Sequence, residues 1–278
     1  MDATPPQAER YTHGHHHAVV SSHARRTAAN SAAFLLPHLL PGMRLLDVGC
    51  GPGSITVDLA ALVAPGEVVG VDREPAVLEG ARSLAAARGL ANTHFEPADV
   101  YQLPFDGGSF DVVYAHQVFQ HLARPVEGLR EVRRVLRPGG IVAIRDSDYG
   151  TMVHAPHEPL LDRWLELYHQ VTRANGAEAD AGRHLKGWAV AAGFTDVEAS
   201  ASTWWYSDDE ARRGWAELWA VRITEGAFAE QAIGARLSDA AELDRLAAAW
   251  RAWAERPGAF FAFLHGEVLA RTPAPPAD

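Results

Sequence analysis

Three glycines at alternate positions form the part of the sequence that points most directly to chemistry. Gly49, Gly51 and Gly53 follow an apolar segment at 44–48 and precede a segment with helical patterning at 54–64. Glycine lets the backbone turn sharply and lets a ligand approach with no Cβ in the way. The unpaired N–H groups at the start of a helix can meet that ligand. Such a loop serves several kinds of nucleotide site, so its spacing has to distinguish between them.

Two acidic side chains accompany this loop. Asp47 lies just before it, and Asp72 ends the next apolar segment, where a carboxylate can accept hydrogen bonds from both hydroxyls of a ribose. Dinucleotide sites favour the pattern G-x-G-x-x-G, which would place a glycine where this chain has Ser54. Arg73 beside Asp72 suggests a 2′-phosphate pocket, but the glycine spacing argues against one. The pattern favours a ribose-containing ligand other than a dinucleotide.

A regular alternation of short apolar segments and amphipathic segments surrounds the loop. The amphipathic segments have helical spacing and are bounded by Pro or Gly. Such alternation predicts a doubly wound α/β fold with a mostly parallel sheet and helices on both faces. In open sheets of this kind, ligands bind beyond the carboxyl ends of the strands. The predicted strands lie at 44–48, 67–72, 92–96, 110–115 and 141–146, and the predicted helices at 54–64, 75–88 and 125–136.

The regions on either side depart from this alternation. Residues 1–12 show no pattern, and apolar spacing over 19–40 predicts an amphipathic helix that ends at Pro41-Gly42. Beyond Tyr149, the longest helical stretch contains four of the eight tryptophans and precedes a final strand. The predictions for this region are helices at 157–175 and 181–192, a strand at 196–202, a helical stretch at 207–256 and a strand at 259–269.

Four motifs in order resemble those of class I S-adenosylmethionine-dependent methyltransferases. LLDVGCGPGS resembles their first motif, and GVDRE resembles the strand end that binds ribose. ADVYQLPFDGGSFDVVYAH resembles the adenine loop with the fourth strand, and LRPGGIVAIRD the entry to the fifth. The resemblance covers residues 42–147 and is nearest to ubiquinone- and menaquinone-type C-methyltransferases and to tailoring enzymes of secondary metabolism. It implies S-adenosylmethionine as the methyl donor and S-adenosylhomocysteine as the product.

The resemblance also implies an organisation for the whole chain. The expected fold is a doubly wound, mostly parallel seven-stranded Rossmann-like sheet, with an N-terminal helical lid and a helical insertion before the last strand. The predicted parts are an N-terminal segment with a lid helix at 1–40, a cofactor-binding domain at 41–206 and 257–272, a helical acceptor cap at 207–256, and a disordered tail at 273–278.

Around the glycine loop, the resemblance assigns roles to four residues. Gly49 and Gly51 would line the methionine and ribose portion of the cofactor, and Asp72 would hold the ribose hydroxyls. Asp47 would hydrogen-bond the loop or the cofactor ammonium. A purely structural role as a loop acid is the alternative for Asp47.

The later motifs supply the rest of the implied cofactor site. Asp99 would accept a hydrogen bond from the adenine amino group, and the Val100 side chain would pack on the adenine ring. His116 or Gln117 would lie beside the sulfonium. Arg73, next to the ribose-binding carboxylate, completes this set of candidates.

The N-terminal region carries the run His15-His16-His17. Adjacent residues on a helix point about 100° apart, so these three side chains cannot all face one metal ion, and we expect no metal site. In the resembling family the segment before the first strand closes over the site. Tyr11, His15 and Arg26 are then candidates for contact, with Arg26 pairing with the cofactor carboxylate. Solvent exposure of these side chains is the alternative.

Methyl transfer from a sulfonium is an in-line displacement, so the protein mainly aligns the nucleophile and excludes water. A base is needed only if the nucleophile must lose a proton. Candidates for acceptor contact lie where the fourth and fifth strands end, and His121 is expected to be structural. The candidate catalytic residues are His116, Asp146, Asp148 and Tyr149. The candidate acceptor-binding residues are His15, Phe119, Gln120, Trp205, Trp219 and Arg222.

The tryptophans allow two interpretations. Trp204-Trp205-Tyr206, Trp215 and Trp219 could cover a flat acceptor, because rings stack well on aromatic faces. Alternatively they pack the accessory helices together, as the spacing of Trp215 and Trp219 on one helix face suggests. A covered pocket would suit a neutral, flat, moderately apolar acceptor such as a phenol, a quinol or an indole. Carbon methylation is favoured by the resemblance, with oxygen or nitrogen methylation as the alternatives.

Charge and composition exclude several other partners. The formal net charge is −10, Lys186 is the only lysine, and no basic cluster exists to neutralise phosphates, so we expect no nucleic-acid acceptor. No apolar stretch approaches the roughly 20 residues that span a bilayer, so no membrane insertion is expected. A single cysteine, Cys50, fits a reducing compartment, and the cytoplasm is the expected location.

A homodimer is left open, and the rival functions are an NAD(P)-dependent oxidoreductase, a macromolecule methyltransferase and a non-catalytic binding module.

Overall fold

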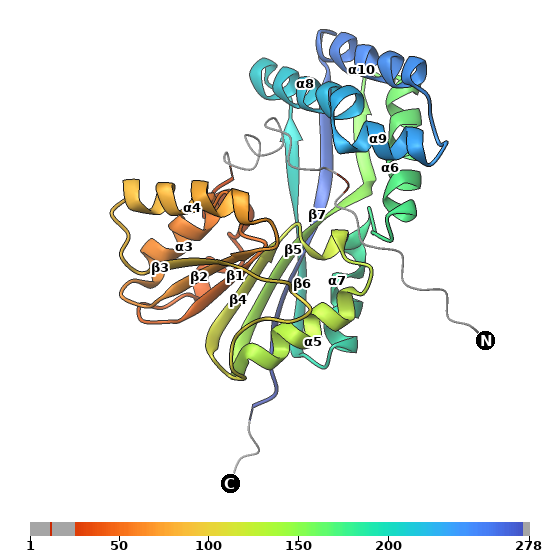
Figure 1. Ribbon diagram of the computed structural model, residues 1–278. Coiled ribbons are helices and arrows are strands. Elements are labelled where there is room, and N and C mark those ends of the chain that lie inside the picture. Colours follow the sequence, from red (N-terminus) through yellow and green to blue (C-terminus); the bar gives the residue numbers. More distant parts are fainter. Residues whose placement is uncertain (1–11, 13–25, 275–278) are drawn as a thin grey trace, which may run out of the picture.

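The computed structural model describes Thr12 and residues 26–274 of the chain (Figure 1). Its strands form one seven-stranded sheet in the order β3-β2-β1-β4-β5-β7-β6. The strands are β1 Leu45–Val48, β2 Val68–Asp72, β3 Thr93–Pro97, β4 Phe110–His116, β5 Leu136–Ala155, β6 Thr195–Tyr206 and β7 Phe260–Arg271. The helices are α2 Ala28–Ser31, η1 Leu36–His38, α3 Ser54–Val63, α4 Pro75–Ala87, η2 Phe119–His121, α5 Pro125–Val135, α6 Pro159–Ala174, α7 Ala181–Ala191, α8 Asp209–Glu225, α9 Ala227–Gly234 and α10 Ala240–Ala254.

The sheet is mostly parallel, as predicted. β1 pairs in parallel with β2 and β4, and further parallel pairs join β2 to β3 and β4 to β5. β7 lies between β5 and β6 and runs antiparallel to both. The chain builds outward from β1 in one direction and then returns to build in the other direction from β4. The strand order therefore reverses between β1 and β4, and ligands of open α/β sheets bind at the carboxyl edge of this point.

Helices cover both faces of the sheet, and the pleat decides which residue faces which helix layer. On β4, Val113 and Ala115 pack in the cluster that includes α5 and α7, whereas Val112 and Tyr114 pack in the cluster that includes α2 and α3. The Tyr114 hydroxyl also donates to the backbone of Ser31 at 2.7 Å. Because successive side chains of a strand point to opposite faces, the pleat directs the residue after Ala115 toward the α2 and α3 side.

β5 is much longer than predicted. The sequence placed its end at residue 146, but the strand continues to Ala155 with a register shift between Asp148 and Val153. The extension pairs with β7, and β7 in turn pairs with β6 as far as Tyr206. This pairing partner lies more than a hundred residues away, so local patterning could not reveal it. Together the three strands form a ribbon that rises out of the sheet (Figure 1).

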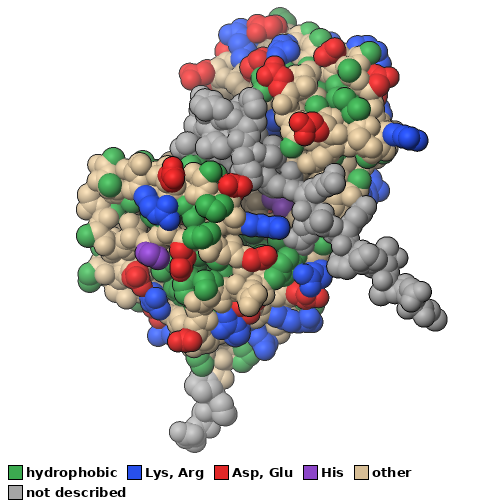
Figure 2. Space-filling model, in the orientation of Figure 1, with side chains coloured by type: hydrophobic (Ala, Val, Ile, Leu, Met, Phe, Trp, Pro, Cys, Tyr) green, Lys and Arg blue, Asp and Glu red, His purple; other side chains and the backbone are tan. Residues whose placement is uncertain are grey.

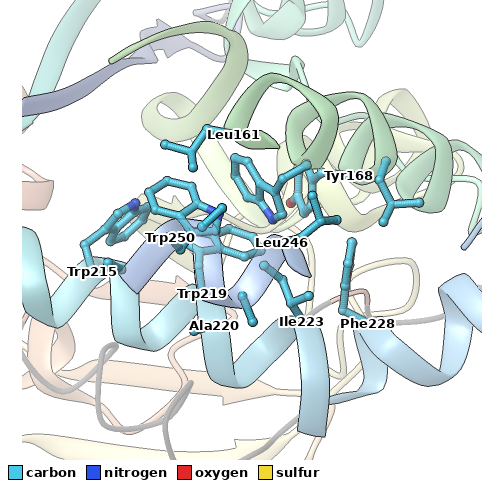
Figure 3. Close-up of a cluster of buried hydrophobic side chains, with 14 of the residues drawn as sticks. Leu161, Tyr168, Trp215, Trp219, Ala220, Ile223, Phe228, Leu246 and Trp250 are labelled. Carbon is cyan, nitrogen blue, oxygen red and sulfur yellow. The ribbon is translucent and has the colours of Figure 1, made fainter. Parts of the chain in front are cut away.

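The ribbon carries a helical cap made of α6, α8, α9 and α10 (Figure 1). Aromatic side chains such as Trp219, Trp250 and Tyr168 fill its centre (Figure 3). Between ring centroids, Trp164 lies 4.4 Å from Trp219 and 5.0 Å from Trp250. The predicted cap boundaries of 207–256 omit α6, which precedes β6 in the sequence but packs in the same cluster. The cap is therefore assembled from two separate parts of the chain.

The predicted helix over 19–40 is wrong as a continuous element within the described residues. α2 spans four residues and begins at Ala28, because Thr27 has an extended backbone and caps the helix together with Asn30. Pro37 cannot donate a backbone hydrogen bond in a helix interior, and it lies at the start of the short helix η1 instead. Residues 13–25 lie outside the described part of the chain. Of the helices in the described part, none is long and apolar enough to cross a membrane.

We predict that Trp164→Ala lowers the free energy of unfolding by about 3 to 5 kcal/mol, because it removes a fully buried indole and leaves a cavity in the cap. The measurement is urea unfolding followed by circular dichroism. Trp205→Ala is the matched control, because the Trp205 side chain is 57% exposed and its removal opens no cavity. Equal losses for the two variants would contradict the packing described here.

Candidate active site

The glycine loop between β1 and α3 has the geometry that its spacing predicted. Gly49, Gly51 and Gly53 all have positive φ, at 70°, 53° and 78°. A Cβ on Gly49 would lie 2.4 Å from Val118 Cγ2, and one on Gly53 would lie 2.7 Å from Ala81 Cβ. A Cβ on Gly51 would meet no described atom within 4 Å. Packing therefore requires glycine at the two outer positions, while the middle one faces open space that a ligand can enter.

Asp72 ends β2 beside this space and is only partly buried. Its Oδ2 accepts a hydrogen bond from the Gly51 N–H at 2.9 Å, and its Oδ1 accepts one from the Glu74 N–H at 3.0 Å. Each carboxylate oxygen retains a further lone pair that can accept from a ribose hydroxyl. An open space over Gly51 beside this carboxylate fits the sugar of a nucleoside.

The other predicted cofactor residues near this edge differ in exposure. Asp99 follows β3, is exposed, and accepts a hydrogen bond from the Tyr101 N–H at 3.0 Å. Val100 beside it is 8% exposed, and Arg73 is exposed. Asp99 and Val100 follow the strand next to the one that ends in Asp72, so the three side chains share one edge of the sheet.

Asp47 is buried under the loop. It accepts a hydrogen bond from the Thr56 hydroxyl at 2.6 Å, which ties the end of β1 to α3. The pKa of Asp47 is raised to about 7, mainly by burial; the Thr56 hydrogen bond opposes this effect, and the nearby charge of Asp72 adds to it. This contact supports the structural alternative for Asp47, that of an acid holding the loop.

Two of the candidate catalytic acids, Asp146 and Asp148, are buried on the α5 and α7 side of β5. Asp146 Oδ1 accepts from the Gln120 N–H at 3.4 Å, and burial raises the pKa of Asp146 to about 8. Both oxygens of Asp148 accept from the Arg183 guanidinium of α7, at 2.7 and 2.5 Å. The two acids thus hold η2 and α7 against the end of the sheet.

The opposite face of the same strands carries a buried polar cluster. Arg145 of β5 is fully buried, and its Nε donates to Glu267 Oε1 of β7 at 3.2 Å and to Ser202 Oγ of β6 at 3.1 Å. Its Nη1 lies 3.5 Å from His116 Nδ1, at the end of β4. Sequence reasoning found only His116 of this cluster, because the strand pairing that brings the others to it is long-range. Arg and Glu are rarely buried, and when they are, they are paired. A buried Arg–Glu pair is therefore an unusual feature that indicates a functional site here.

Gln117 connects this cluster to the N-terminal segment. It has a φ of 55°, which is rare for a residue other than glycine and costs backbone strain of the kind found at functional sites. Its Oε1 accepts from Arg26 Nη2 at 2.5 Å, and its Nε2 lies 2.9 Å from His265 Nε2 of β7. Arg26 therefore contacts a predicted cofactor residue. In Figure 2 a histidine side chain is visible at the waist between the cap and the sheet.

Above the polar cluster, the ribbon turns aromatic toward the cap. The Trp204 ring lies 4.2 Å from His265 and 5.8 Å from Phe263, and Tyr149 lies 5.5 Å from Phe263. Trp205 points the other way, 57% exposed and stacked on Phe260 at 4.6 Å. Of the two neighbouring tryptophans, Trp204 is the one that faces the site.

The remaining predicted acceptor residues fall in different places. Phe119 is fully buried in the sheet core, and Gln120 accepts from the Ser147 hydroxyl at 2.5 Å. Trp219 is fully buried in the centre of the cap, and the Arg222 guanidinium lies 5.0 Å from its ring. For Trp219, this supports the alternative of packing between helices. Tyr11 and His15 lie outside the described residues.

One group of metal-ligating side chains gathers in the described part of the chain. The potential ligand atoms of His154, His157 and Asp162 lie within 4.8 Å of one another at the junction of β5 and α6. His157 Nε2 already pairs with Asp162 at 2.7 Å, and His154 Nε2 accepts from the Glu158 N–H at 3.2 Å. These contacts hold the start of α6, so we assign the group no metal.

Comparison with known proteins agrees with this geometry. A family model described as a methyltransferase domain matches residues 39–197, more than half of the chain. Over 272 residues the chain is 32% identical to an uncharacterized methyltransferase of Schizosaccharomyces pombe, covering 93% of this chain and 95% of the relative. A shorter match, 34% identical over 130 residues, is with the demethylmenaquinone methyltransferase of Lactococcus lactis and covers 46% of this chain and 49% of the relative.

The solved structures give the same fold. The YcgJ protein from Bacillus subtilis superposes with a TM-score of 0.57 at 19% identity, covering 94% of this chain and all of that chain. This likeness concerns the fold, while the family rests on the sequence matches. With the glycine loop and the carboxylate of Asp72 at the carboxyl edge of the sheet, the chain belongs to the methyltransferase family and is an S-adenosylmethionine-dependent enzyme of class I.

Proposed function

We propose that this methyltransferase acts on a small, flat, largely neutral acceptor of the phenol, quinol or indole type, and that it methylates carbon. Methylation of an oxygen or nitrogen on a similar small molecule is the second candidate. The proposal rests on one observation, the graded lining of the ribbon face beyond the end of β4. The polar cluster around Arg145 lies at the cofactor end of this face, and aromatic rings lie at the cap end.

This gradient suits a ring with one polar substituent. Trp204 is only partly buried and offers an aromatic ring on which a flat acceptor packs well, and Phe263 and Tyr149, buried in the adjoining aromatic cluster, support it. His265, next to Trp204, begins the polar part of the same face. A charged acceptor would have to give up its hydration against aromatic rings, which is costly. The lining therefore favours a neutral ring whose polar end points toward the sheet.

The residues around the loop would hold the methyl donor. Gly51 leaves room for it, Asp72 would accept from the ribose hydroxyls, and Asp99 with Val100 would meet the adenine. Gln117 and His116, at the end of β4, would lie beside the sulfonium. S-adenosylmethionine supplies an activated methyl group, and the task of these residues is to hold it in line with the acceptor and to exclude water.

The positions of the candidate acids bear on which atom is methylated. Asp146, whose pKa is raised to about 8 by burial, and Asp148, which pairs with the Arg183 guanidinium, both lie on the α5 and α7 side of β5, opposite the assigned acceptor face. Burial also raises the pKa of Tyr149. A hydroxyl acceptor benefits from a base as it attacks, whereas a ring carbon attacks with its own π electrons and loses its ring proton only after the new bond has formed. These three residues therefore favour carbon as the acceptor atom.

The relatives and the surface agree with a small acceptor. One relative, matched over about half of its length, is named a demethylmenaquinone methyltransferase. On the face shown in Figure 2, acidic and basic side chains are interspersed, with no continuous basic surface of the kind that nucleic acids require. Expectations of a cytoplasmic location and of a homodimer stay predictions.

The direct test of the function is incubation of the purified protein with a metabolite extract and S-adenosylmethionine that carries a trideuterated methyl group. We expect mass spectrometry to find a small product in which one trideuteromethyl group replaces one hydrogen, formed together with S-adenosylhomocysteine. Fragmentation would place the label on a ring carbon. Label found only on macromolecules would contradict the proposal, and label on oxygen or nitrogen would favour the second candidate.

We predict that Asp72→Asn weakens S-adenosylhomocysteine binding by at least about tenfold, because an amide nitrogen cannot accept and one backbone or ribose donor loses its partner. Isothermal titration calorimetry measures the affinity. Glu67→Gln is the matched control, because Glu67 precedes the same strand at the opposite edge of the sheet and pairs there with Arg44. An unchanged affinity in Asp72→Asn would remove the basis for the assigned cofactor site.

The raised pKa of Asp146 predicts that the free energy of unfolding of the wild type falls as the pH rises. Between its ordinary pKa of 3.8 and the folded value of about 8, the unfolded chain releases a proton that the folded protein retains. The wild type therefore loses stability relative to Asp146→Asn as the pH rises through this range, by up to about 1.4 kcal/mol per pH unit. Urea unfolding of both proteins between pH 5 and pH 8 measures the difference.

The control is Asp106→Asn, which changes an exposed carboxylate in the loop before β4. The difference in the free energy of unfolding between this variant and the wild type should stay constant across the same pH range. If the difference between wild type and Asp146→Asn is constant with pH, the buried carboxyl does not hold its proton in the way described.

A further inference from the structure

His265 of β7 lies at the centre of the ribbon face that we assign to the acceptor. Its side chain is fully buried. The ring lies 4.2 Å from Trp204, 4.8 Å from Phe263 and 6.3 Å from His116, between centroids. It stands where the aromatic part of the face meets the polar part.

Hydrogen-bond donors and acceptors fix which nitrogen of His265 carries the proton. Arg26 can only donate, so the Gln117 atom facing it at 2.5 Å is the amide oxygen. The Gln117 NH₂ group must then face His265, whose Nε2 lies 2.9 Å away. Because an amide nitrogen only donates, His265 Nε2 is the acceptor.

The ring of His265 is neutral. Burial lowers the pKa of His265 well below its ordinary range, and the positive charges of Arg145 and Arg26 lower it further. A neutral imidazole with an accepting Nε2 carries its proton on Nδ1. Arg26 and Gln117 therefore select one tautomer of His265.

The Nδ1–H group of His265 is buried and has no hydrogen-bond partner among the described residues. Two neighbouring donors on this face are paired: Arg145 donates to Glu267, and the Ser202 hydroxyl donates to the same carboxylate at 2.5 Å. A buried donor without an acceptor is rare and unfavourable in native proteins. This N–H group, fixed in one tautomer beside the aromatic rings, can donate a hydrogen bond to an acceptor atom of a bound ligand.

Resting on the proposed function, we infer that the Nδ1–H group of His265 donates a hydrogen bond to an oxygen of the acceptor, and that Arg26 and Gln117 hold His265 in the tautomer that does so. The acceptor class is thereby narrowed to flat rings that carry a hydroxyl or carbonyl oxygen. His265 acts as a positioning and selecting residue. It is not the base, because its Nε2 lone pair is already engaged by Gln117.

The tautomer is tested without any acceptor. In protein labelled with ¹⁵N-histidine, long-range proton–nitrogen correlations should show His265 neutral at neutral pH, with the proton on Nδ1. The signal is assigned by its loss in His265→Phe. In Gln117→Glu, a carboxylate can accept from both Arg26 and His265, so the proton should move to Nε2. A wild-type proton on Nε2, a doubly protonated ring, or an unchanged tautomer in Gln117→Glu would overturn the inference.

The selecting role is tested with two probes of similar shape. The protein loaded with S-adenosylhomocysteine is titrated with 2-naphthol and with 2-methylnaphthalene, in which a methyl group of similar size replaces the hydroxyl. We expect the wild type to bind 2-naphthol at least about tenfold more tightly, as expected for a hydrogen bond from a buried donor, and His265→Phe to lose this preference. His184→Phe, which changes an exposed histidine of α7, should retain it.

The outcomes separate this inference from the function on which it rests. If His265→Phe binds S-adenosylhomocysteine and still prefers 2-naphthol as strongly as the wild type does, the role of His265 is overturned and the proposed function stands. If the loaded wild type binds neither ring, the acceptor class fails, and the role of His265 fails with it. S-adenosylhomocysteine affinity in each variant shows that the protein is folded.

Discussion

The pleat of β5 is the constraint on which the site depends. Successive side chains of a strand point to opposite faces, so Arg145 and Ser147 lie on one side of the sheet and Asp146 and Asp148 on the other. The acids are used to hold η2 and α7, while the other face receives Glu267 and His265 from β7. A shift of β5 by one residue would exchange these faces and place carboxylates where the acceptor is expected.

The buried polar groups of this face contribute little to the stability of the fold, which suggests that they have another role. A buried ion pair such as Arg145 with Glu267 adds little net stability, because desolvation of the charges offsets their attraction. Gln117 adds a strained backbone at the same place. The nearby aromatic cap shows that this chain packs apolar cores readily. Arginine, glutamate and a strained glutamine at the end of β4 are therefore better explained by ligand binding than by folding.

Local features of the sequence were enough to predict one half of the molecule. The glycine loop, Asp72 and the first four strands are encoded by short-range spacing, and the structure has them within a few residues of the predicted bounds. The other half depends on contacts between distant segments. The extension of β5, the place of α6 in the cap, and the approach of His265 to Gln117 all need the pairing of β7. Among neighbouring residues of like type, as with Trp204 and Trp205, only the strand register shows which one faces inward.

The position of β7 has a consequence for how the chain matures during synthesis. β7 follows β5 and β6 in the sequence yet lies between them in the sheet, so those two strands present open edges until β7 has been synthesised. Unpaired edges invite association with other chains. The nucleotide-binding half can form earlier, because β1 to β4 pair without β7. A nascent chain can thus form the half that carries the glycine loop before the ribbon of β5, β6 and β7 exists, and a product truncated before residue 260 would leave β5 and β6 with unpaired edges that are prone to association.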